Sequence, residues 1–78
     1  MAQMPLHGVV FQEGGHWVAQ CWTVDHAAQA EDKDQAVQEC VEGARESIRF
    51  AEENEMRLEP PPTAVLDRGV AGQYWTRK

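Results

Sequence analysis

The chain has 78 residues, 42% of them hydrophobic and 26% charged, which leaves room for one small globular domain with a thin core. Thirteen acidic residues against seven basic ones give a formal net charge of −6, which argues against direct DNA binding and favours a basic protein partner. The N-terminus has no signal-peptide pattern and no stretch is apolar enough to span a membrane, so we expect a cytoplasmic protein. Small domains are often stabilised by self-association, and we therefore expect a homo-oligomer, either a dimer or a tetramer.

The first part of the chain predicts a β-hairpin. Leu6 to Gln12 is rich in strand-forming residues, and Glu13-Gly14-Gly15 supplies glycines for a tight turn. The following strand, His16 to Trp22, places Trp17 and Trp22 on opposite faces. At most one of these tryptophans therefore points into the core, and both are candidate contact residues for a partner.

A third strand is expected at Ala27 to Glu31, although alanine is a weak strand former. It follows the polar pair Asp25-His26. Such a pair at the end of a strand is more often a turn than an acid-base dyad, and no other nucleophile or paired carboxylates accompany it. We therefore predict no enzymatic activity, and Asp25 and His26 are interpreted as candidate contact residues.

The strongest pattern predicts a helix from Lys33 to about Asn54, with Asp32 as its N-cap. Gly43 lies inside this helix at a cost of about 1 kcal/mol relative to alanine, so a neighbouring group is expected to pack closely against it. Glutamates occupy the polar face and are candidate contact residues: Glu39, Glu42 and Glu46. The apolar positions recur every three or four residues and define the buried face: Ala36, Val37, Cys40, Val41, Ala44, Ile48 and Ala51.

Three consecutive prolines, Pro60 to Pro62, separate a domain at residues 1–62 from a C-terminal extension at residues 63–78. Thr63 to Leu66 is a candidate for a short fourth strand at the edge of the sheet. Gly69 to Lys78 is interpreted as a tail that docks on this protein or on a neighbouring copy, with Trp75 as a candidate contact residue.

The cysteines and histidines do not follow the spacing of a metal or redox motif. Cys21 and Cys40 are expected to be buried thiols. No metal site and no cofactor is predicted.

The order of these residues resembles the HicB-like antitoxin family. The resemblance covers Leu6 to Pro62 and rests on Val9 to Cys21, on Ala27 to Asp32 and on Gln35-Ala36-Val37 with Glu42. It implies a partly degraded RNase-H-like domain of the α+β class, in which a three-stranded antiparallel sheet is followed by one long helix and the nuclease carboxylates are absent. It also implies that the chain neutralises a small basic toxin that cleaves mRNA.

Two other functions stay open at this point. The same fold would serve a phage or host inhibitor of another nuclease or of a defence protein. A small-molecule-binding oligomer, with pockets between subunits around Trp17, Trp22 or Trp75, is the third hypothesis.

Overall fold

The sheet begins with the predicted hairpin. The computed structural model describes residues 5–57 and 72–78. Strand β1 (Leu6–Glu13) pairs antiparallel with β2 (His16–Cys21), and the last pair of the ladder is Glu13 with His16. Gly14 and Gly15 form the two-residue turn with φ angles of 58° and 84°, which only glycine adopts without strain at both positions. The turn chemistry thus fixes the register of the hairpin.

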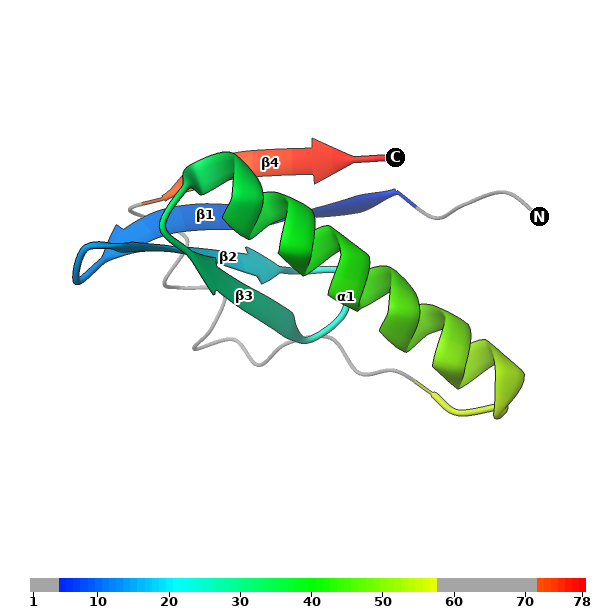
Figure 1. Cartoon of the computed structure of the whole chain (residues 1–78). Coiled ribbons are helices and arrows are strands. Elements are labelled where there is room, and N and C mark those ends of the chain that lie inside the picture. Colours follow the sequence, from blue (N-terminus) through cyan, green and yellow to red (C-terminus); the bar gives the residue numbers. More distant parts are fainter. Residues whose placement is uncertain (1–4, 58–71) are drawn as a thin grey trace.

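Two further strands complete the sheet, whose order is β3-β2-β1-β4 (Figure 1). Strand β3 (His26–Ala30) pairs antiparallel with β2 and begins and ends one residue earlier than predicted. Strand β4 (Gln73–Arg77) pairs antiparallel with the opposite side of β1. Residues 73–77 of the expected tail therefore dock on their own chain as an edge strand, whereas the candidate strand Thr63 to Leu66 lies outside the described residues.

Helix α1 (Lys33–Glu53) crosses one face of the sheet, as Figure 1 shows. Its start is the predicted one, because Asp32 Oδ2 accepts a hydrogen bond of 3.1 Å from the Gln35 amide. The predicted apolar face is the one that packs on the sheet, with Ile48 only partly buried. This arrangement confirms the α+β class and the three antiparallel strands followed by one long helix.

The core lies between α1 and the sheet, and β3 contributes only the partly buried Ala28 and Ala30, which pack against it. Its buried members are Leu6, Val10, Ala19, Cys21, Val24, Ala36, Val37, Cys40, Val41, Ala44 and Trp75. Both cysteines are buried free thiols, as expected. Trp75 is 6% exposed and its ring lies over Gly8, so it packs the core and offers no surface to a partner. Trp75, expected at a contact surface, is buried in the single chain because β4 turns this side chain toward the helix.

Within the described ranges, no helix combines the length and the hydrophobicity needed to cross a bilayer.

Candidate functional site

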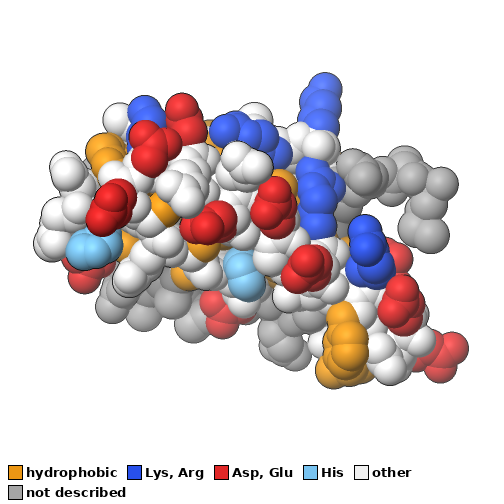
Figure 2. Space-filling model, in the orientation of Figure 1, with side chains coloured by type: hydrophobic (Ala, Val, Ile, Leu, Met, Phe, Trp, Pro, Cys, Tyr) orange, Lys and Arg blue, Asp and Glu red, His pale blue; other side chains and the backbone are white. Residues whose placement is uncertain are grey.

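The exposed face of α1 carries a row of carboxylates. Glu39, Glu42 and Glu46 are all exposed, and their spacing of three and four residues places them on one side of the helix. Because α1 turns its apolar face to the sheet, this row faces away from the core. Figure 2 shows acidic side chains distributed along this side of the molecule. We call Glu39, Glu42 and Glu46 the acidic row.

His26 connects the acidic row to the edge of the sheet. It is the first residue of β3, and its imidazole packs against the backbone of Gly43 in α1. Glu39 and Glu46 lie four residues before and three residues after Gly43, so they share this flank of the helix. Strand β3 and the acidic row therefore form one continuous surface. The close neighbour predicted for Gly43 is this ring.

Apolar surface extends the same flank. Phe50, seven residues after Gly43, lies two turns further along α1 and is 58% exposed. An exposed aromatic ring beside carboxylates is a common composition for a protein contact, since the ring supplies buried area and the charges supply orientation.

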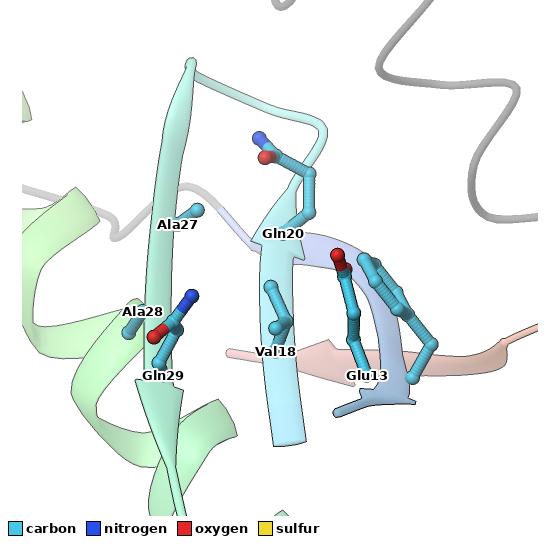
Figure 3. Close-up of a pocket in the computed structure, with 7 residues that line it drawn as sticks. Glu13, Val18, Gln20, Ala27, Ala28 and Gln29 are labelled. Atoms are coloured by element: carbon cyan, nitrogen blue, oxygen red, sulfur yellow. The ribbon is translucent and has the colours of Figure 1, made fainter. Parts of the chain in front are cut away.

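The sheet face that lies away from α1 contains a hollow of about 370 Å³. Strands β1, β2 and β3 all contribute to it, and Figure 3 shows side chains of Val18, Gln20 and Gln29 around it. The lining residues are Phe11, Glu13, Val18, Gln20, Ala27, Ala28 and Gln29. The described residues of its wall include one carboxylate and no cation, so they lack the convergent charges of a site for a charged metabolite. Residues of β3 line the hollow, which therefore lies beside this strand on the sheet face away from α1.

Trp17 and Trp22 lie in different environments, and neither is buried in the core as Trp75 is. Trp17 is half-buried against the core, with Lys33 Nζ 5.9 Å from its ring centroid. Trp22 lies on the other face of the sheet beside His7 and Tyr74, with ring centroids 6.1 Å away in both cases. The prediction that at most one of Trp17 and Trp22 faces the core is confirmed. None of the three tryptophans is among the described residues that line the hollow.

The cluster of His7, Trp22 and Tyr74 was not predicted. Tyr74 Oη lies 3.4 Å from His7 Nδ1, and Tyr74 is 62% exposed. The sequence contains a signal for it, because His7 alternates with core residues of β1 and therefore points to the outer face. The contribution of Tyr74 had no such signal, since it depends on the pairing of β4 with β1.

The two residues of the Asp25-His26 pair have different surroundings. Asp25 is exposed in the turn before β3, whereas the ring of its neighbour His26 is held against Gly43. In residues 5–57 and 72–78, no three His, Cys, Asp or Glu side chains are grouped so that they could hold a metal ion. Burial raises the pKa of the Cys40 thiol to about 12, so this thiol is protonated at neutral pH and is a poor nucleophile.

No protein-family model matches the chain, and neither a curated protein nor a solved structure shows a significant similarity to it.

Proposed function

We propose that this chain is a non-catalytic protein-binding domain and that its specific role is that of a HicB-like antitoxin, which neutralises a small basic toxin that cleaves mRNA. The observation that carries the proposal is the acidic row on the exposed face of α1, opposite the residues that pack on the sheet. Three carboxylates on one rigid helix attract a basic surface and orient it.

The fold supports the same proposal. Three antiparallel strands followed by one long helix are the architecture that the resemblance to HicB-like antitoxins implies. Both cysteines are free thiols, as is usual in a reducing compartment, and this agrees with a cytoplasmic location. We also propose a homo-oligomer, which would present the acidic row more than once and raise the avidity for a toxin.

A phage or host inhibitor of another nuclease or defence protein would use the same charged surface. The two functions differ in the partner, because an antitoxin binds a small basic ribonuclease whereas an inhibitor binds a protein of unrelated size and fold. The identity of the bound protein therefore distinguishes them.

The test is affinity purification of the tagged protein from its native host, followed by mass spectrometry of the bound proteins. A variant without the acidic row, E39Q/E42Q/E46Q, is compared with D34N/E52Q/E55Q, which loses the same charge at three other exposed carboxylates. We expect wild type and the control variant to retain a small basic protein that arrests growth when it is expressed alone. The variant without the acidic row should bind it about tenfold more weakly.

Two results would contradict the proposal. Equal binding by the two triple variants would remove the acidic row from the contact. A bound protein that is neither basic nor toxic, or one whose toxicity this chain does not suppress, would exclude the antitoxin role.

A further inference from the structure

Strand β3 is an edge strand without the usual protection against pairing. Among the described residues it pairs with β2 alone, and its sequence, His26-Ala27-Ala28-Gln29-Ala30, has no proline, lysine or acidic residue. The opposite edge, β4, contains Arg77 and is followed by Lys78. Proteins generally block edge strands with charged residues or proline, because the open backbone groups of an edge recruit other strands. Within the part of the chain that the structure describes, the two edges of the sheet therefore differ, and β3 is the open one.

The hydrogen-bond pattern identifies the free backbone groups of β3. The Trp22 amide donates to the His7 carbonyl, so β2 residues at even positions point their backbone groups toward β1. Odd positions of β2 consequently bond to β3, where their partners in the register are His26, Ala28 and Ala30. Ala27 and Gln29 are left with their N–H and C=O groups pointing away from the sheet. Both residues are exposed.

Acidic side chains surround this open edge. Asp25 precedes β3 and Glu31 follows it, and both are exposed. On the helix side, Glu39 and Glu46 lie on the flank of α1 that His26 contacts through Gly43. A strand added beside β3 would therefore meet carboxylates at both ends and along its helix-facing side.

These charges determine whether a strand from a second copy of the chain or one from a basic partner can pair with β3. Antiparallel pairing of two β3 strands over their full length centres on Ala28 and places Asp25 of each copy opposite Glu31 of the other. Like charges directly opposite each other destabilise a strand pair. A strand with lysine or arginine at alternate positions would instead bring opposite charges to the same places.

We propose that an extended segment of a basic protein adds to the sheet as a strand antiparallel to β3. Its backbone bonds to the N–H and C=O groups of Ala27 and Gln29, and its basic side chains extend toward Glu39 and Glu46. Its intervening side chains lie on the face of the hollow, beside Ala27 and Gln29. This inference rests on the proposed function for the basic partner and adds the mode of binding.

The probe is a synthetic peptide, acetyl-Lys-Val-Lys-Val-Lys-Val-Lys-amide. In the proposed pairing two of its three valines lie opposite Ala27 and Gln29, so the amides of these valines form the hydrogen bonds while the lysine side chains face α1. Three matched peptides accompany it, in which glutamate replaces lysine, the valine amides are N-methylated, or the lysine amides are N-methylated. Binding is followed by amide chemical shifts and amide hydrogen exchange of the ¹⁵N-labelled protein.

We expect the lysine peptide to bind with a Kd between about 10 μM and 1 mM and to slow the amide exchange of Ala27 and Gln29. Methylation of the lysine amides should change the affinity less than about threefold, whereas methylation of the valine amides should reduce it by more than about tenfold. The glutamate peptide should not bind. In the protein, Ala27→Pro should abolish binding, because proline lacks the outward N–H, and Ala27→Ser should preserve it.

Three results would overturn the proposal: no saturable binding of the lysine peptide at millimolar concentration, equal affinity of the two methylated peptides, or binding without slower exchange at Ala27 and Gln29. The peptide comparison uses the wild-type protein, so it decides the question even if Ala27→Pro fails to fold. If E39Q/E42Q/E46Q loses the captured basic toxin and Ala27→Pro keeps it, the proposed function stands and pairing at β3 is excluded. If the lysine peptide binds at β3 but the host yields no basic partner, strand pairing at β3 is supported and the proposed function is not.

Discussion

The imidazole of His26 lies directly against the backbone of Gly43, which ties the first residue of β3 to the middle of α1. A Cβ atom built at position 43 would overlap the ring, and the nearest neighbours of that Cβ are all His26 ring atoms. The glycine that costs helix stability is therefore the residue that allows the helix to approach the edge strand.

This contact predicts that the effect of Gly43→Ala depends on His26. In wild type the added methyl group displaces the ring, and we expect the free energy of unfolding to fall by about 1 to 2 kcal/mol. In a His26→Ala background the same change should raise it by about 1 kcal/mol, the ordinary gain of alanine over glycine in a helix. Urea unfolding of the four proteins measures the coupling. An equal change in both backgrounds would show that the ring does not limit position 43.

Strand β4 places two aromatic residues in opposite environments, and their substitution should have unequal effects. Trp75 is 6% exposed in the core, so Trp75→Ala should lower the free energy of unfolding by about 3 to 5 kcal/mol, which is enough to unfold a domain of this size. Tyr74 is 62% exposed, and Tyr74→Ala should cost less than about 1 kcal/mol. Circular dichroism and thermal unfolding of both variants make the comparison. Similar losses for the two would contradict the packing of β4 described above.

The start of α1 depends on one side chain. Asp32→Ala removes the acceptor for the Gln35 amide and should cost about 1 kcal/mol in the free energy of unfolding. Asp32→Asn keeps an oxygen in the same place and should cost at most a few tenths of a kcal/mol. Urea unfolding of the two variants at neutral pH separates capping from charge. If Asn destabilises as much as Ala, the carboxylate charge, and not the hydrogen bond, stabilises this end of the helix.

The buried thiol of Cys40 should make stability depend on alkaline pH. Burial raises its pKa from 9.0 to about 12, so the unfolded chain loses this proton at lower pH than the folded chain. The stabilisation that follows from the raised pKa is complete below about pH 9 and is lost as pH rises toward about 12. The stability difference between wild type and Cys40→Ala should therefore become smaller above about pH 9.

Urea unfolding of both proteins at a series of pH values tests this, and the titratable groups distant from Cys40 cancel in the comparison. A difference that stays constant from neutral pH to about pH 11 would contradict the raised pKa of Cys40. Thiol titration gives a second check, since Cys40 should react with a thiol reagent only after unfolding.

The sequence by itself determined the parts of this protein that depend on neighbours along the chain. Gly14 and Gly15 specify the hairpin turn, the repeat from Ala36 to Ala51 specifies the buried face of α1, and Asp32 specifies its start. Each of these follows from backbone preference or from the period of the side chains. The acidic row could be predicted for the same reason, because it is the opposite face of a helix whose apolar face was known.

Only the tertiary structure decided where distant segments meet. Trp75 was expected at a contact surface and is in the core, because the pairing of β4 with β1 is set by packing between segments more than sixty residues apart. The same reason applies to His26, whose position on Gly43 joins the acidic row to β3, and to the free backbone groups of Ala27 and Gln29. Which edge of a sheet stays open depends on the order of the strands in space, and that order is a property of the packed core.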